Sequence, residues 1–513
     1  MQKTKLGIVT LVAIAVCAAI CACGSTEKTP LPAPQNVHAE QRELVWDEVK
    51  NAAGYVVRYL NTEYETSENR YDLSELTEPN TYEIKVLAIG DNKNNVDSEW
   101  TTYSYTVIEP VEHGYDESGL EYTLLADGTG YEVSRGKHKL FGVVEIPDYY
   151  YTLPVKRIAN EAFFFHSGIE YPNPITGNLC NIATTGIRLP SRLETIGEYA
   201  FSCMIKLTEV EIPETVTQIE RHAFNGCKSI KRIKLPRGLK VITESSFANC
   251  TFDEIIFPEE LEEIEERAFF SDRPRYEKWQ RLYPSYKKLE IPETVKRIGN
   301  SAFQGWLELE EITLPSGIEW FNKGVFYETA WYDSRPDGYI VLGDILYEYK
   351  GVAEENAVIE IPSNVKKIAG GAFDWKKTIA EIYIPDGVQL IGSMIFSGCR
   401  ALSKIRLPAD LTVIPDRAFT GCDSLESLMI PSSVKEIGSL ALTSCSSLKY
   451  VYYEGTESDW EEGVKYINDK GEEIPKSILF SQDDTVVCYY SETAPETAGN
   501  YWHYVNNEPT LWQ

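Results

Sequence analysis

The sequence predicts a mainly β protein with short helical turns, built as a repeat solenoid that follows a small antiparallel β-sandwich. Two observations predict the solenoid: a proline after an apolar pair, and a phenylalanine eleven residues later, return about every 23 residues over most of the chain. A third observation predicts the sandwich. Residues 35–108 alternate apolar and polar positions in short runs, which turn-forming residues separate.

Length and charge limit the class of protein. A chain of 513 residues holds either more than one domain or one long repeat array. The formal net charge of -29 argues against binding to nucleic acid or to an anionic membrane through charge. We expect most of this charge to serve solubility.

The N-terminus predicts secretion and a lipid anchor. A basic start precedes an apolar run that ends near Ile20 and is too short for an ordinary membrane-spanning helix. Ala22 before Cys23 resembles the bacterial lipobox. The resemblance implies that residues 1–22 are a lipoprotein signal peptide and that Cys23 carries the lipid. A plain cleaved signal is the alternative. Residues 23–34, rich in Pro, Ser and Thr, are expected to form a short linker.

Residues 35–110 resemble a fibronectin type III module. Trp46 stands where that family has an early core tryptophan, and Leu76 and Tyr82, in "LTEPNTY", match its tyrosine corner. The resemblance implies a spacer between the membrane and the following domain. The acidic and amide-rich loop 90–98 could hold calcium. It lacks the spacing of an EF-hand loop, so a solvated hairpin turn is the favoured interpretation.

One repeat, residues 402–424, shows the logic of the array. Ile405 and Leu407 lie two apart and share one face of a strand, which Pro408 ends because it cannot donate to a strand ladder. A three-to-four spacing that suits a helical turn follows in Leu411, Ile414, Ala418 and Phe419. The few apolar side chains of one repeat cannot offset the entropy of ordering 23 residues, so repeats must stack.

Stacking in register predicts columns of like side chains. We expect Phe419 to lie between Phe396 and Leu442. A cysteine column is expected at Cys227, Cys250, Cys399, Cys422 and Cys445. Buried free thiols are the favoured state, because stacked side chains point the same way and the chain has no C-x-x-C pair for zinc.

The consensus L-x-x-I-x-I-P, V-x-x-I, A-F-x-G-C resembles leucine-rich repeats of the BspA-like, or Treponema-type, class. The resemblance implies a solenoid over 112–454, with inserts near 270–288 and 331–351, and a C-terminal cap over 455–513. We expect "YIVLGDILYEY" in the second insert to form a hairpin that turns at Gly343-Asp344.

Two positions depart from the consensus. Trp306 stands where other repeats have cysteine, and Leu442 replaces the phenylalanine.

Catalytic and metal-binding patterns are missing from the sequence. There is no G-x-S-x-G, H-E-x-x-H or Walker loop, and the six histidines are far apart in the chain. We therefore expect no enzymatic activity, no metal site and no cofactor.

The outward-facing strand residues, two and four before each proline, predict the binding surface. In the early repeats they alternate in charge, which favours cross-strand ion pairs rather than a ligand site. In the late repeats, tyrosines and a methionine gather around two cations, a composition that contact surfaces favour. The candidate binding residues are Tyr383, Lys404, Arg406, Met429, Tyr450 and Tyr452.

The family resemblance implies adhesion or recognition at a bacterial cell surface. We expect a surface-exposed, extracytoplasmic lipoprotein that contacts the membrane through its lipid anchor alone and binds a surface protein. A glycan-capture accessory protein and a structural component of the cell envelope are the alternatives.

Overall fold

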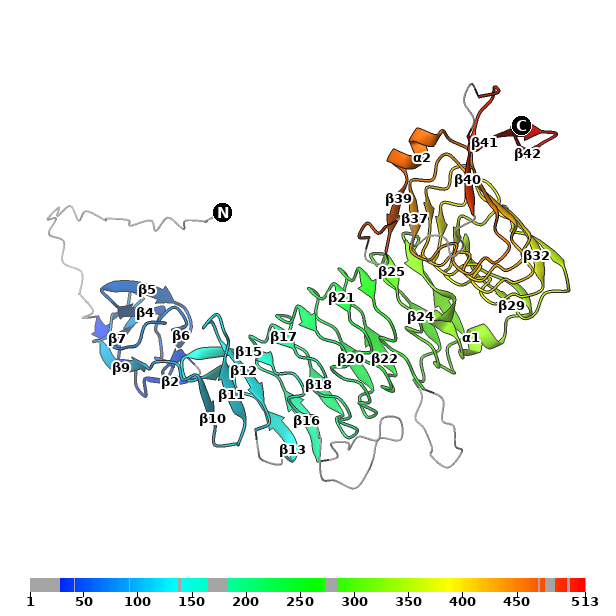
Figure 1. Cartoon of the computed structure of the whole chain (residues 1–513). Helices are drawn as coiled ribbons and strands as arrows, with labels where there is room; N and C mark the ends of the chain where they lie inside the picture. The colour runs from blue at the N-terminus through cyan, green and yellow to red at the C-terminus, as the bar shows by residue number, and fades with distance from the viewer. Residues whose placement is uncertain are drawn as a thin grey trace. The chain divides into compact units, whose positions relative to one another are not determined.

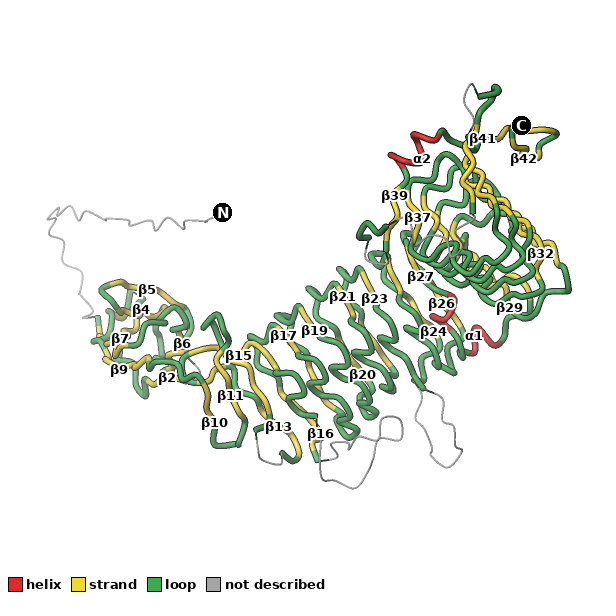
Figure 2. The backbone as a smooth tube through the Cα atoms, in the orientation of Figure 1, coloured by secondary structure: helices red, strands yellow, loops and turns green. Residues whose placement is uncertain are grey.

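The computed structural model describes residues 28–40, 42–91, 93–136, 140–164, 183–272, 284–468, 471–475, 485–495 and 499–512. Strands and loops make up most of these residues, and the helices are short (Figures 1 and 2). The chain divides into two compact units, of which the first ends at Pro110 and the second begins at Val111. The predicted signal peptide and Cys23 lie outside the described residues.

The first unit is an antiparallel β-sandwich. One sheet has the order β2 (His38–Glu40), β3 (Glu43–Val45), β6 (Arg70–Asp72), and the other β5 (Thr62–Thr66), β4 (Gly54–Tyr59), β7 (Asn80–Ile89), β9 (Thr101–Val107). A short parallel pair joins β1 (Thr29–Pro30) to β8 (Asn95–Val96). Trp46 is buried between the sheets, with its ring edge-on to Tyr55. The predicted tyrosine corner is confirmed, because the Tyr82 hydroxyl donates to the Glu78 carbonyl at 2.8 Å.

The acidic loop of this unit is a tight turn built on one carboxylate. Asp91 Oδ1 accepts hydrogen bonds from the backbone N–H groups of Asn95, Asn94 and Lys93 at 2.8–2.9 Å. These bonds, led by that from Asn95, lower the pKa of Asp91 to about 2. The loop joins β7 to its antiparallel partner β9, as the predicted hairpin requires, and it also contains β8.

The second unit is a solenoid with two rows of parallel strands. The first strand row consists of β13 (Gly142–Glu145), β16 (Thr184–Arg188), β18 (Glu209–Glu211), β20 (Arg232–Lys234), β22 (Glu254–Ile256), β24 (Lys288–Glu290), β26 (Glu311–Thr313), β30 (Ala357–Glu360), β32 (Ile379–Tyr383), β34 (Lys404–Arg406), β36 (Ser427–Ile430), β38 (Tyr450–Tyr453) and β40 (Val486–Tyr490). The second strand row consists of β15 (Leu153–Ile158), β17 (Thr195–Ile196), β19 (Gln218–Ile219), β21 (Val241–Ile242), β23 (Glu263–Ile264), β25 (Arg297–Ile298), β27 (Trp320–Phe321), β29 (Ile345–Lys350), β31 (Lys367–Ile368), β33 (Leu390–Ile391), β35 (Val413–Ile414), β37 (Glu436–Gly438) and β39 (Lys465–Ile467).

The remaining elements begin, interrupt and end these rows. They are the strands β10 (His113–Tyr115), β11 (Glu121–Leu124), β12 (Tyr131–Ser134), β14 (Tyr149–Tyr150), β28 (Gly338–Leu342), β41 (Tyr501–Val505) and β42 (Glu508–Leu511), the 3-10 helix η1 (Lys323–Phe326), and the helices α1 (Ala330–Asp333) and α2 (Glu457–Gly463). Within the described residues, no helix has the length and apolar character that crossing a bilayer requires.

Consecutive turns, rather than the predicted helical turn, follow the second strand in most repeats, whereas the 3-10 helix η1 follows β27. In the repeat quoted above, β35 is followed by turns through Phe419. The physical reason lies in the hydrogen bonds: the N–H of Phe419 donates to the Ala441 carbonyl of the next repeat at 2.8 Å, and the N–H of Gly421 donates to the Thr443 carbonyl at 3.0 Å. Backbone donors that bond to the next repeat are not available to a helix.

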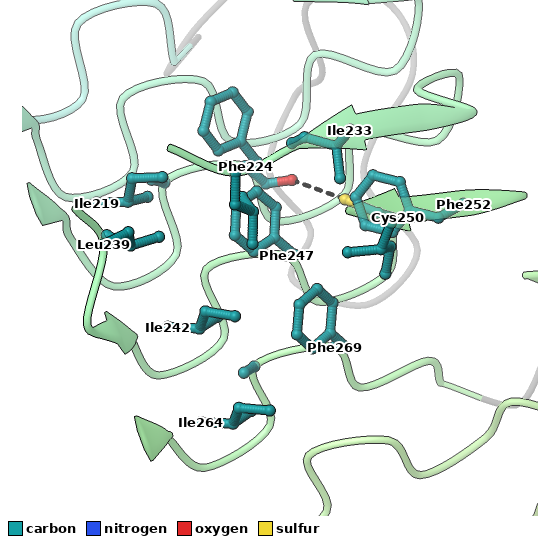
Figure 3. Close-up of a cluster of buried hydrophobic side chains, with 14 of the residues drawn as sticks. Ile219, Phe224, Ile233, Leu239, Ile242, Phe247, Cys250, Phe252, Ile264 and Phe269 are labelled. Carbon is teal, nitrogen blue, oxygen red and sulfur yellow. Dashed lines mark hydrogen bonds between the residues drawn. The ribbon is translucent and has the colours of Figure 1, made fainter. Parts of the chain in front are cut away.

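The predicted phenylalanine column is confirmed. The rings of Phe396 and Phe419 stack with centroids 5.4 Å apart, and Leu442 follows as a buried residue of the same core. Phe224, Phe247 and Phe269 form the equivalent stack in the earlier repeats (Figure 3).

The cysteine column is held by hydrogen bonds between repeats. The Cys250 thiol donates to the Phe224 carbonyl of the preceding repeat at 3.2 Å, as Figure 3 shows. The other column thiols make the same bond at 3.0–3.3 Å. Trp306 departs from the consensus in residue type but not in role, because its indole N–H donates to the Phe269 carbonyl at 2.7 Å. The five cysteines of the column are buried free thiols, as expected.

The second insert continues the core. β28 and β29 form the predicted hairpin, with Leu342 opposite Ile345 across the turn. Tyr347 of β29 places its ring 5.9 Å from Phe326, and Tyr349 places its ring 6.0 Å from Phe373. Two tyrosines thus carry the aromatic column across the interruption. Most of the first insert, residues 273–283, lies outside the described residues.

Candidate functional site

The candidate site lies on the outward side of the first strand row, on β32, β34, β36 and β38. Successive side chains of a strand point to opposite faces, so the buried Ile382, Ile405 and Val451 fix which residues face outward. Tyr383 stands opposite Arg406, and Met429 opposite Tyr452, in the parallel register. The register therefore brings the predicted residues onto one surface.

Three of these residues form an open half of the site. Lys404 and Arg406 are exposed, and Tyr383 is partly exposed. The Arg406 guanidinium lies 2.7 Å from the Asp386 carboxylate, and the Tyr383 hydroxyl donates to Glu381 at 2.6 Å. Exposed ion pairs of this kind contribute little to stability, so a ligand could replace them at small cost.

The other three residues form a half that the chain itself covers. Met429 and Tyr450 are partly buried, and Tyr452 is only 8% exposed. Trp502 of β41 lies against Tyr452, with ring centroids 5.6 Å apart, and is fully buried. The expectation that every candidate residue faces solvent is therefore wrong for Tyr452, because the C-terminal hairpin β41–β42 packs over this end of the row.

Polar contacts hold the hairpin in place. The indole N–H of Trp502 donates to the Tyr453 carbonyl at 3.0 Å, and the Tyr504 hydroxyl donates to the Glu454 carboxylate at 2.6 Å. Just beyond the hairpin turn, the Glu508 carboxylate lies 3.8 Å from the Lys404 ammonium. The hairpin thus borders the open half and supplies an acidic residue next to its lysine.

Electrostatics of the site follow from these contacts. The bond to Glu381 raises the pKa of the Tyr383 hydroxyl, and the Ala409 N–H together with Arg406 lowers the pKa of Asp386. The Asp386 carboxylate is therefore ionised beside Arg406 at neutral pH. Such a surface can bind acidic or hydrogen-bonding groups.

The early part of the row agrees with the charge-ladder interpretation at two places. Arg232 of β20 lies 2.9 Å from Glu254 of β22, and Arg188 of β16 pairs with Glu145 of β13. Each pair joins adjacent strands at opposite register positions. Among the described residues, no three His, Cys, Asp or Glu side chains gather as metal ligands would.

Two features of the surface were missed by the sequence reasoning. One is that the C-terminal hairpin covers part of the candidate site. The signal was the aromatic segment "YWHYV" (501–505), which could pack on the outward-facing tyrosines of the last strands. The other is Trp375, which is 57% exposed on the turn side of its repeat. Its signal was the replacement of the consensus glycine in "AFDWK" (372–376).

Repeats that stack in register through parallel strands, with the first strand row facing outward, define a leucine-rich repeat solenoid. The sequence matches the family profile of the BspA type leucine rich repeat region in six copies, over residues 178–273, 282–333 and 349–464, which together make up just over half of the chain. The chain therefore belongs to the BspA-type leucine-rich repeat family.

Solved structures of bacterial proteins resemble this chain at low identity. A leucine rich cell surface protein from Faecalibacterium prausnitzii A2-165 is 23% identical, with 73% of this chain and 96% of that chain covered and a TM-score of 0.33. The pneumococcal vaccine antigen PcpA is 21% identical, with 75% and 95% covered and a TM-score of 0.38. A leucine-rich repeat protein from Bacteroides ovatus ATCC 8483 is 21% identical, with 69% and 99% covered and a TM-score of 0.32. A search of curated proteins found no match.

Proposed function

We propose that the chain is a non-enzymatic, surface-exposed lipoprotein that recognises a surface protein of a host or another microbe through the open half of the site. Its lipid would be attached at Cys23, and the fibronectin-like sandwich would space the solenoid from the membrane. Membership of the BspA-type family supports recognition or adhesion through the repeats.

The observation that carries the proposal is the open half itself. Lys404 and Arg406 are exposed and held only by exposed carboxylates, and Tyr383 lies beside them. Arginine and tyrosine dominate the energetics of protein interfaces, whereas the early part of the row pairs its charges across strands. An acidic segment of a partner would replace Glu508 at Lys404 and Asp386 at Arg406.

Binding of the purified full-length chain to an array of host and microbial surface proteins tests the proposal. For any partner found, we expect Lys404→Ala with Arg406→Ala to weaken binding at least tenfold, with an affinity that falls as salt rises. Arg232→Ala is the matched control, because Arg232 occupies the same outward position and is also ion-paired. Equal losses in both variants, or none, would reject the site.

Anchoring needs a separate test. Cys23→Ala should release the chain from the membrane fraction and abolish its labelling by a fatty-acid probe. Retention of both properties in that variant would exclude a lipid at Cys23.

A further inference from the structure

The second half of the predicted linker is attached to the sandwich. β1 pairs in parallel with β8, and the Thr29 N–H donates to the Asn94 carbonyl at 3.3 Å. The Leu31 N–H continues this ladder by donating to the Val96 carbonyl at 3.1 Å. The chain is therefore fixed to the sandwich from Thr29 onward.

Side-chain contacts hold the same segment. The side chain of Leu31 is only 5% exposed and packs in the apolar core of the sandwich. The Thr101 hydroxyl donates to the Pro34 carbonyl at 2.6 Å. An apolar anchor and a hydrogen bond thus keep residues 31–34 from acting as a free tether.

Little chain remains between this docked segment and the proposed lipid. Five residues, 24–28, separate Cys23 from Thr29. An extended chain spans at most about 3.6 Å per residue, so the path from Cys23 to Thr29 covers at most about 22 Å. A lipid on Cys23 would hold β1 within this distance of the lipid headgroups.

The surface next to β1 is polar. It is formed by the loop 90–98, which contains β8, the partner of β1. The carboxylates of Asp91 and Asp97 accept the backbone N–H groups that shape this loop. The exposed large apolar side chains of the described unit, Leu60 and Ile108, lie outside it. Polar groups are costly to bury in hydrocarbon, so the loop suits the hydrated headgroup layer rather than the bilayer core.

The chain leaves the sandwich at the opposite end. β7 runs for ten residues from Asn80 to Ile89, and the loop 90–98 follows its last residue. Val107, the last residue of β9, stands opposite Asn80 at the other end of β7. At about 3.3 Å per residue, the two ends of β7 lie about 30 Å apart. The attached end and the exit of this unit are therefore on opposite sides.

We infer that the sandwich has a membrane-facing pole, formed by β1 and the loop 90–98, which lies against the hydrated headgroup layer of a bilayer. The inference rests on the proposed lipid at Cys23. The short tether, and not charge, holds the pole at the membrane. A free tether over the whole of 23–34 would instead allow any face of the sandwich to approach the bilayer.

Energy transfer from the sandwich to the bilayer tests this orientation. The mature full-length chain is reconstituted by its own lipid into phosphatidylcholine vesicles that contain a headgroup-labelled acceptor. A donor dye is attached at Lys93→Cys in the loop, or at Thr106→Cys, which stands opposite Thr81 near the far end of β7. The described native cysteines are buried, and Cys180, outside the described residues, is replaced by serine in both chains. We expect transfer from position 93 to be at least about twofold more efficient than transfer from position 106.

A longer tether is the matched control, because it leaves the sandwich unchanged. About ten Gly and Ser residues inserted after Thr26 should lower the transfer from position 93 towards that from position 106. Hydrogen exchange should find the Leu31 amide protected with either tether.

The outcomes separate the orientation from the lipid. Equal transfer from positions 93 and 106, in a chain that floats with the vesicles, would overturn the inference and leave the lipid at Cys23 standing. Rapid exchange of the Leu31 amide would overturn it as well. A chain that does not float would refute the lipid, and the inference with it.

Discussion

Truncation of one ring in the phenylalanine column measures how much the stacking contributes. Phe396 is fully buried, with its ring 5.8 Å from Phe373 and 5.4 Å from Phe419. The backbone ladders between repeats hold these neighbours in place, so the structure cannot collapse into the space that Phe396→Ala leaves. A buried Phe→Ala change costs about 3–5 kcal/mol. We expect a loss of stability in the upper half of that range, because the ladders oppose the relaxation that would reduce it.

Phe396→Leu is the matched control, because Leu442 occupies the same column position naturally. The leucine keeps most of the apolar volume and loses two aromatic contacts, each worth about 0.5–1.5 kcal/mol beyond area burial. We therefore expect a loss of about 1–3 kcal/mol for leucine, smaller than that for alanine.

Hydrogen exchange measured by mass spectrometry is the suitable assay, because each repeat contacts only its neighbours and opening is local. Exchange in peptides spanning 373–422 should accelerate by about two orders of magnitude or more in Phe396→Ala, since each 1.4 kcal/mol is tenfold. Peptides of the sandwich unit should be unaffected. Acceleration of less than about fivefold in 373–422 would refute the idea that the column stabilises the stack.

Three further changes test other parts of the structure. Trp306→Phe keeps a ring in the column but leaves the buried Phe269 carbonyl without its indole donor, so urea unfolding should show a loss of about 1–3 kcal/mol; an unchanged midpoint would contradict the shared donor role. Gly398→Ala should lower the thermal midpoint, because φ is +72° and the new Cβ would lie 3.0 Å from Trp375; adding Trp375→Gly should relieve only the steric part, and full recovery would refute the backbone argument. Burial raises the pKa of Cys445 to about 11, so it is protonated at pH 8, and alkylated-peptide mapping should find the described thiols unmodified until the chain unfolds. The unfolded chain releases this proton near the ordinary pKa of 9, so stability should fall as pH rises from about 9 towards 11; a constant stability over that range would contradict the burial.

Repetition explains why so much of the solenoid could be predicted. A proline and a phenylalanine in fixed phase determine the strand end and the core position of each repeat, so Phe396 and Phe419 could be placed together without a structure. The hairpin at Gly343 was predicted for a different reason, because its turn chemistry is local. Both signals lie within one or two repeats of the residues that they determine.

Features that depend on contacts beyond neighbouring repeats could not be predicted in this way. The alternation along a strand predicted that Tyr452 faces outward, but it did not predict the hairpin that covers it. The covering residue, Trp502, is 50 residues further along the chain. The turn after β35 was expected to be helical because three-to-four spacing of apolar residues has the same period in a helix and in these stacked turns. Hydrogen bonding between repeats decided between them.

The last strand of the first row has a consequence for association between molecules. A row of stacked parallel strands ends in a strand whose outer backbone N–H and C=O groups are unpaired. A similar strand of another molecule could pair with these groups. Here the sheet finishes in β42, the outer strand of a hairpin, which runs antiparallel to β41 and carries Pro509. Proline has no N–H to donate, and the reversed strand presents the wrong polarity for another repeat. The hairpin therefore protects the edge of the sheet from pairing with another molecule. Duplication of a 23-residue unit upstream would lengthen the protein without making it polymerise.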